Sequence, residues 1–227
     1  MDVYVVGDVD ESIIKNIFRE YFKVRTYHKE DFDILVDELN GNSRVKELSE
    51  VDDVNQSQLT LLCNFNKLTD YERKYVLPIY GELLGGSTNS ILFNTVREKN
   101  SYAYYVNAIV KPYDNIMMIY AGIEKGTEKD VYKLIQKSLK EVVHGKFDDN
   151  KLDSAKKTMC SAIIASLDSP VGIITGEMAK VLVNAKNPDE RIEEFKKIKK
   201  SDIITVSKKV NIHSKFILEA ADEENNN

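Results

Sequence analysis

A short connection between two strand-like segments constrains the fold of this chain more than any other sequence feature. Residues 104–110 and 116–121 are rich in β-branched, aromatic and other apolar side chains, which favours β-strands. Between them, residues 112–115 read Pro-Tyr-Asp-Asn, which are residue types typical of turns. So short a connection cannot cross back over a sheet, so the two strands are predicted to form an antiparallel hairpin.

The other periodic segments surround this hairpin in an order that does not fit a regular parallel sheet. Further strands are predicted from Gln56 onward and at residues 216–220. Apolar residues at helical spacing predict a helix over residues 129–144 and several more over residues 148–209. Strands and helices therefore do not alternate strictly. We expect an α+β fold, with a mostly antiparallel sheet and helices packed on one face.

The first 54 residues differ in character from the rest. Residues 3–6 form a β-branched and aromatic run that predicts a strand, and apolar residues at helical spacing follow from Ile13 to Tyr21. Residues 27–54 are acidic and lack sustained periodicity, which predicts a linker. The predicted division is therefore a first unit (residues 1–26), a linker (27–54), a main domain (55–222) and a disordered tail (223–227).

Composition disfavours several classes of partner. The net charge of −5 argues against nonspecific nucleic-acid binding, which depends on clustered Lys and Arg. No apolar stretch is long enough to cross a bilayer, and the N-terminus does not resemble a signal peptide, so we expect no membrane partner. A cytoplasmic location is the expectation, with Cys63 and Cys160 as buried free thiols.

The sequence contains no recognisable catalytic or metal-binding set. His28, His144 and His213 are far apart, and none has a second donor at a spacing that would hold zinc, so surface or capping roles are expected. Ser87 and Ser90 have no neighbouring His and are predicted to cap a helix rather than act as nucleophiles.

The most specific segment covers residues 83–104 and reads LLGGSTNSILFNTVREKNSYAY. Gly85 and Gly86 are predicted to end a helix through their ability to adopt positive φ, and Thr69 with Glu72 forms a capping box at the start of that helix. A phosphate-binding loop is the other interpretation of the two glycines. It is disfavoured because no Gly-Lys-Ser/Thr follows.

This segment resembles the pattern of the insulinase-like family of zinc metallopeptidases, also called pitrilysin-like or inverzincin. In that pattern a helix ends in Leu-Gly-Gly, a Ser-containing turn leads to Leu-Phe, and Arg-Glu-Lys precedes Ala-Tyr. The matching motif residues are Gly85, Gly86, Ser87 and Phe93. The resemblance covers about residues 55–220 and implies a C-terminal, non-catalytic domain. It also implies that residues 1–26 are the end of a preceding domain of the same family, in a longer protein.

The resemblance also implies roles for individual residues. In active members a first domain binds zinc through His-x-x-Glu-His, which is absent here, so zinc is expected only in a preceding domain or partner subunit. Arg97 and Tyr104 match the Arg and Tyr that contact the substrate backbone. A guanidinium fork and a phenol can both hold a peptide carbonyl, although neither can activate water. In the alternative, Arg97 pairs with an acid and Tyr104 fills the sheet surface.

Two functions follow from this resemblance. The chain could be the peptide-binding half of a zinc metallopeptidase, with another insulinase-family domain supplying the zinc in cis or in trans. Alternatively, it could belong to a pseudoenzyme or assembly subunit without peptidase activity. An unrelated α+β ligand-binding domain is a third hypothesis, and it requires the motif to be coincidental.

Overall fold

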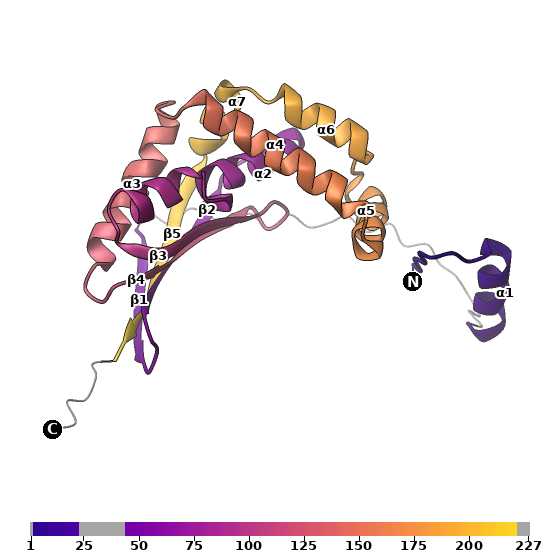
Figure 1. Cartoon of the computed structure of the whole chain (residues 1–227), viewed down its shortest axis with the longest axis horizontal. Coiled ribbons are helices and arrows are strands. Elements are labelled where there is room, and N and C mark those ends of the chain that lie inside the picture. The colour runs from indigo at the N-terminus through magenta and orange to yellow at the C-terminus, as the bar shows by residue number, and fades with distance from the viewer. Residues whose placement is uncertain (1, 23–43, 222–227) are drawn as a thin grey trace.

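The computed structural model describes residues 2–22 and 44–221, and its second range is organised around one five-stranded sheet. The strand order is β1-β5-β2-β4-β3, and the helices lie on one face (Figure 1). Within this sheet β1 runs parallel to β5, and the other pairs are antiparallel. The expected α+β class is confirmed. The strands are β1 (Lys46–Asp52), β2 (Ser57–Phe65), β3 (Ala103–Lys111), β4 (Ile116–Ile123) and β5 (Val210–Ala220).

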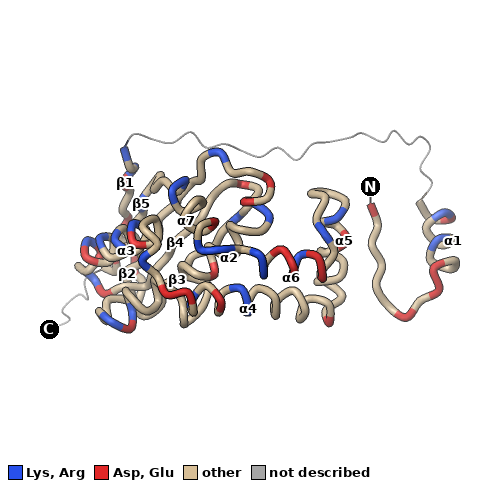
Figure 2. The backbone as a smooth tube through the Cα atoms, turned by 90° about the horizontal axis from the view of Figure 1, so that it is seen from above, with Lys and Arg blue, Asp and Glu red and all other residues tan. Residues whose placement is uncertain are grey.

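The helices come from two stretches of the chain, before and after the β3–β4 hairpin. The first stretch contains one short α-helix, α2 (Leu77–Gly81), and three wide π-helical turns, η1 (Glu72–Val76), η2 (Glu82–Gly86) and η3 (Phe93–Glu98). The second contains α3 (Glu128–Val143), α4 (Asp149–Ser166), α5 (Pro170–Val183), α6 (Pro188–Lys197) and α7 (Lys200–Ser207). Lys and Arg lie beside Asp and Glu along α3 and α6 (Figure 2).

No single helix within the described residues is long and apolar enough to span a membrane. Helices α4 and α5 together reach that length and composition, but they are bent by 105° at the break between them.

The core lies between the sheet and the helices of both stretches. Alternate residues of β2, including Leu59 and Leu61, are fully buried on the helix side, as the two-residue period of a strand requires. Ile79 and Tyr80 of α2 are also fully buried there. The predicted capping box is confirmed, because the Thr69 amide donates to a Glu72 carboxylate oxygen at 2.7 Å and the Glu72 amide donates to the Thr69 hydroxyl at 3.2 Å.

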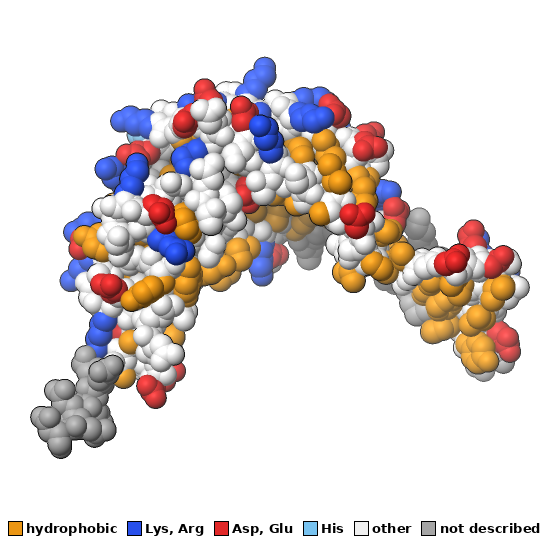
Figure 3. Space-filling view, viewed as in Figure 1, with side chains coloured by type: hydrophobic (Ala, Val, Ile, Leu, Met, Phe, Trp, Pro, Cys, Tyr) orange, Lys and Arg blue, Asp and Glu red, His pale blue; other side chains and the backbone are white. Residues whose placement is uncertain are grey.

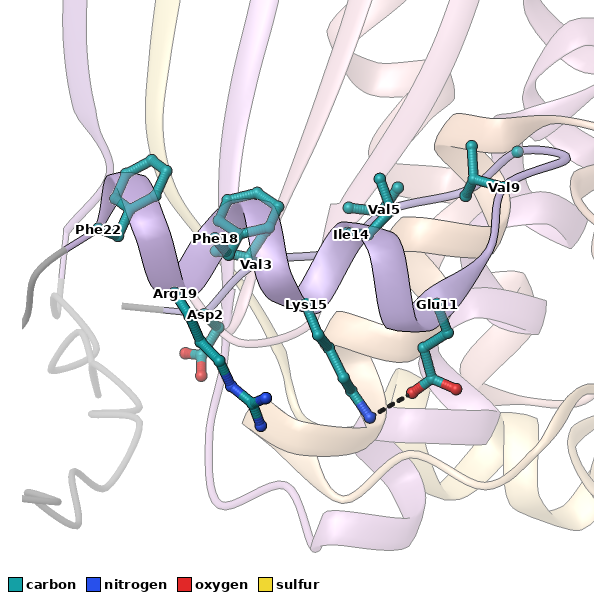
Figure 4. Close-up of a pocket in the computed structure, with 11 residues that line it drawn as sticks. Asp2, Val3, Val5, Val9, Glu11, Ile14, Lys15, Phe18, Arg19 and Phe22 are labelled. Atoms are coloured by element: carbon teal, nitrogen blue, oxygen red, sulfur yellow. Dashed lines mark ion pairs between the residues drawn. The ribbon is translucent and has the colours of Figure 1, made fainter.

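Residues 2–22 form an N-terminal unit, consisting of an extended segment and α1 (Glu11–Tyr21). The Asp10 side chain caps α1 by accepting from the Ser12 amide at 2.8 Å. An open hollow of about 750 Å³ lies between the two parts, and Val3, Val5 and Val9 lie there alongside Ile14, Phe18 and Phe22 (Figure 4). No residue of α1 is buried. The predicted strand at residues 3–6 is not formed, since extended backbone becomes a strand only when a neighbour shares its hydrogen bonds.

The predicted linker differs from the structure in its last part. Residues 46–52 form β1, an edge strand whose residues are all exposed, and charged side chains interrupt its apolar pattern. Sequence periodicity therefore could not detect it. Residues 27–43 and the predicted tail at 223–227 lie outside the described residues. The last strand is also longer than predicted and begins at Val210.

The two cysteines occupy different environments. Cys63 is buried in β2, and this burial raises the pKa of its thiol to about 12. Cys160 is half-buried on α4, so the prediction of a buried thiol is correct for Cys63 and wrong for Cys160. Both are free thiols.

Candidate functional site

Arg97 and Tyr104 lie at the junction of η3 and β3, where the chain folds back on itself. The Tyr102 amide donates to the Val96 carbonyl at 3.1 Å, and the Ser101 amide donates to the Arg97 carbonyl at 2.9 Å. Ser101 adopts a φ of +54°, a left-handed conformation that turns the backbone sharply between η3 and β3. These contacts place the last turn of η3 against the start of β3.

The Arg97 guanidinium is held mainly by an aromatic ring. Its Cζ lies 4.9 Å from the centroid of the Phe93 ring, and its Nε lies 3.8 Å from a Glu98 carboxylate oxygen. The Arg97 side chain is 46% exposed. An exposed ion pair at this distance contributes little free energy. The alternative, in which Arg97 pairs with an acid, is therefore met only by this weak ion pair with Glu98. The N–H groups of Arg97 remain accessible.

Tyr104 occupies a β-bulge. Ala103 pairs with Ile123 and Tyr105 pairs with Gly122, so Tyr104 is an extra residue between two paired positions. A bulge changes the direction of the side chains around it. The alternative interpretation supposed that Tyr104 fills the sheet surface. Tyr104 is 58% exposed and does not do so.

Tyr105, rather than Tyr104, packs on the sheet surface, and sequence reasoning did not identify Tyr105. Its ring lies 6.1 Å from that of Tyr120 on β4, centroid to centroid. Simple alternation along β3 would have identified Tyr105 only if the bulge at Tyr104 had been known.

Gly85 and Gly86 allow η2 to lie close to β3. A Cβ on Gly85 would be 2.5 Å from the Ala108 amide nitrogen, so only glycine fits without a shift of the strand. The φ of Gly85 is −156°, and Gly86 also does not have a positive φ. Helix η2 ends at Gly86, as predicted, but the expectation that the two glycines end it through positive φ is wrong. Close packing of helix on sheet is the physical reason for Gly85.

The Ser-containing turn is tied to its surroundings by hydrogen bonds. The Ser90 hydroxyl accepts from the Phe93 amide at 3.4 Å, which confirms a capping role for Ser90. Ser87 contributes its carbonyl, which accepts from the Ser90 amide at 3.0 Å. Lys151 at the start of α4 donates to the Asn89 carbonyl at 2.6 Å, so this turn is anchored to the second helical stretch.

Within residues 2–22 and 44–221, no three His, Cys, Asp or Glu side chains come together as a metal site. His144 lies at the end of α3, where its Nδ1 is 2.7 Å from the Lys140 carbonyl, consistent with the predicted capping role. His213 lies in β5, and His28 is outside the described residues.

Known proteins are similar to this chain in sequence and in fold. Probable inactive metalloprotease YmfF of Bacillus subtilis (strain 168) is 24% identical over 228 residues, covering 98% of this chain and 52% of the relative. Uncharacterized zinc protease YmxG of the same organism is 26% identical over 204 residues, covering 85% of this chain and 47% of the relative. The chain therefore spans about half the length of these curated relatives.

The same half-length match appears among solved structures. A conserved protein from Enterococcus faecalis V583 superposes with a TM-score of 0.84 at 24% identity, over 96% of this chain and 52% of that one. The family model described as "Peptidase M16 inactive domain" matches residues 1–159, which is well over half of the 227 residues. The motif around Arg97 and this match agree, and the chain belongs to the inactive-domain family of the M16, insulinase-like peptidases.

Proposed function

We propose that this chain is the non-catalytic, peptide-binding half of an insulinase-family zinc metallopeptidase. Membership of the inactive-domain family supports this proposal, as does the match to about half of a relative named as a zinc protease. A second insulinase-family domain, in cis or in trans, would hold the zinc and hydrolyse the peptide. This chain would bind and orient the substrate.

The observation that carries the proposal is the turn that presents Arg97 and Tyr104. Both side chains are exposed, and neither makes a hydrogen bond with another described residue. Phe93 supports the guanidinium from one side, which reduces the entropy lost when Arg97 binds a ligand. Together they offer charged and neutral donors to a peptide carbonyl or to its developing oxyanion.

A second candidate function is a pseudoenzyme or assembly subunit. The specific observation in its favour is that the relative covering 98% of this chain is named as a probable inactive metalloprotease. Exposed apolar side chains on α1 and α5, such as Ile13, Val171 and Val181, support pairing with another domain under either function. A cytoplasmic location stays a prediction.

The test is peptide hydrolysis by this chain combined with a zinc-bearing insulinase-family domain. Arg97→Ala and Tyr104→Phe should each lower turnover about tenfold or more, because each removes a donor to the reacting carbonyl. Arg44→Ala and Tyr71→Phe are matched controls at exposed positions elsewhere and should leave turnover unchanged. Unchanged turnover in both test variants would contradict the proposed role.

Two further measurements separate the candidate functions. The chain by itself should show no zinc-dependent proteolysis, and stoichiometric zinc with peptide cleavage would contradict the assignment as the non-catalytic half. The complete gene product should contain His-x-x-Glu-His if the protein is a peptidase in cis. If it does not, and no catalytic partner subunit is found, the assembly function is favoured.

A further inference from the structure

The last turn of η3 is closed by hydrogen bonds to four consecutive carbonyl groups, those of residues 94–97. Carbonyl groups in the last turn of a helix have no partner within the helix, so the residues that follow η3 satisfy them. One donor is the Asn100 side chain, whose Nδ2 lies 2.6 Å from the Thr95 carbonyl oxygen. The other donors are backbone amides, and their pairs, donor first, are Lys99 with Asn94, Ser101 with Arg97, and Tyr102 with Val96.

Asn100 is the one side chain among these four donors. In a π-helical turn such as η3, a carbonyl accepts from the amide five residues later. The Asn100 side chain donates to the Thr95 carbonyl from that same position in the sequence. The backbone can therefore leave the helix at this point, and Ser101 adopts its left-handed φ of +54° directly afterwards. Asn100 thus closes η3 while the chain turns toward β3.

The turn is anchored in the core at both ends but exposed between them. Val96 is fully buried and Ala103 is 8% exposed, whereas residues 97–101 are all exposed. Helix η3 belongs to the helical layer, and Lys, Arg, Asp and Glu predominate on the outer surface of that layer (Figure 3). Apolar packing therefore cannot fix the backbone of residues 97–101. Hydrogen bonds, including that of Asn100, are what hold it in place.

We propose that Asn100 is a positioning residue for Arg97. This inference rests on the proposed function and adds a residue to that same site. The hydrogen bond brackets Arg97, because its acceptor lies two residues before Arg97 and its donor three residues after. Helix ends fray, and a frayed last turn would move the Arg97 backbone relative to the Phe93 ring that supports the guanidinium. Substrate would then be held only by the fraction of molecules in which the turn is closed.

The test is a double-mutant cycle on the complex of this chain with its zinc-bearing domain, with fluorescein-labelled casein as the probe. Asn100→Ala removes the side-chain donor and should lower kcat/KM about fivefold, the effect of losing one hydrogen bond that keeps the turn closed. In the Arg97→Ala background the same change should have no further effect, since Asn100 acts through Arg97. Asn100→Gln keeps an amide donor and should lose less activity than Asn100→Ala.

Asn66→Ala is the matched control. Asn66 is exposed and follows the end of β2 that lies away from Ala103, so this change should leave kcat/KM unchanged. Should Asn100→Ala fail to fold by circular dichroism, Ser101→Val tests the same turn, because a β-branched residue disfavours the left-handed conformation that Gly adopts readily. Ser101→Val should lower kcat/KM more than Ser101→Gly, and only when Arg97 is present.

The possible failures can be told apart. If Arg97→Ala lowers kcat/KM but Asn100→Ala does not, the inference is overturned and the proposed function stands. If Asn100→Ala causes the same loss whether or not Arg97 is present, Asn100 has only a structural role, which also overturns the inference. If the complex cleaves casein no better than its Arg97→Ala variant, both the inference and the proposed function are overturned.

Discussion

The N-terminal unit and the main body contain the same kinds of local pattern, yet only the main body has a core. In the N-terminal unit, α1 is capped by Asp10 and has an apolar stripe, but Ile13 on it is 58% exposed. In the main body, Ile79 of α2 is fully buried. The comparison shows that capping and periodicity suffice to define a helix, whereas its stabilisation by burial depends on a second layer.

The extended segments give the same lesson. Val3, Val5 and Val6 precede α1 in an extended segment without a strand partner, and each is more than a third exposed. Leu59 and Leu61 lie in β2, between β4 and β5, and are fully buried. Both runs favour extended backbone. Only the run with neighbouring strands forms a strand and is buried.

The largest predicted contrast comes from one substitution made in both regions. Ile79→Ala should lower the free energy of unfolding by about 2 to 5 kcal/mol, because it leaves a cavity in the core. Ile13→Ala should change it by no more than about 0.5 kcal/mol, since the side chain is exposed. Urea unfolding followed by circular dichroism measures both. Equal losses of stability for the two variants would contradict the conclusion that only the main body has a core.

The same two variants also test whether another domain covers the N-terminal unit. If another insulinase-family domain covers the N-terminal unit, as proposed above, Ile13→Ala should become destabilising in the complex of the two domains. A stability of the complex that is insensitive to Ile13 would show that α1 is not part of the interface.

A smaller contrast is expected for two glycines. Gly85→Ala should destabilise the protein by about 1 to 3 kcal/mol, because the new methyl group meets the Ala108 backbone. Gly7→Ala in the N-terminal unit meets nothing closer than a Val9 methyl at 3.9 Å and should be close to neutral. Thermal unfolding of the two variants is the measurement. A neutral Gly85→Ala would show that η2 can move away from β3.

The smallest contrast concerns two ion pairs. Lys209 donates to both carboxylate oxygens of Glu72, at 2.7 and 2.6 Å, and so links the start of η1 to the start of β5. Burial acts to raise the pKa of Glu72, but the hydrogen bonds from Lys209 and Thr69 outweigh it and hold the pKa below its usual value of 4.5. The charged form is therefore favoured by folding.

Because the folded-state pKa is lowered, this stabilisation is present above the unfolded pKa and is lost as pH falls through the folded pKa. Glu72→Gln should cost about 1 to 2 kcal/mol at neutral pH, and the cost should shrink in acid below pH 4.5. Glu11→Gln, which removes the exposed pair with Lys15, should change stability little at any pH. Urea unfolding across pH distinguishes them, and a pH-independent cost at Glu72 would contradict the argument.

Much of the fold could be predicted because its signals are local. The hairpin of β3 and β4 follows from a turn between two strand-forming runs, and the capping box at Thr69 follows from residue spacing. Strand β1 was missed because its charged edge has no period, and its pairing with β5 joins residues far apart in the chain. Sequence alone supplied only part of the description of the candidate site, whose role stays a prediction. Resemblance identified Arg97 and Tyr104, while the bulge that exposes Tyr104 and places Tyr105 on the sheet depends on the register with β4.

The α+β class, the capping box at Thr69 and the motif that marks the family could be predicted from the order and spacing of residues along the chain. Tertiary structure alone decided that residues 2–22 lack a buried core and that Gly85 serves close packing. The physical reason is that strand pairing and burial are properties of contacts between distant segments. A local pattern specifies which face is apolar, but only the neighbouring layer decides whether that face is covered.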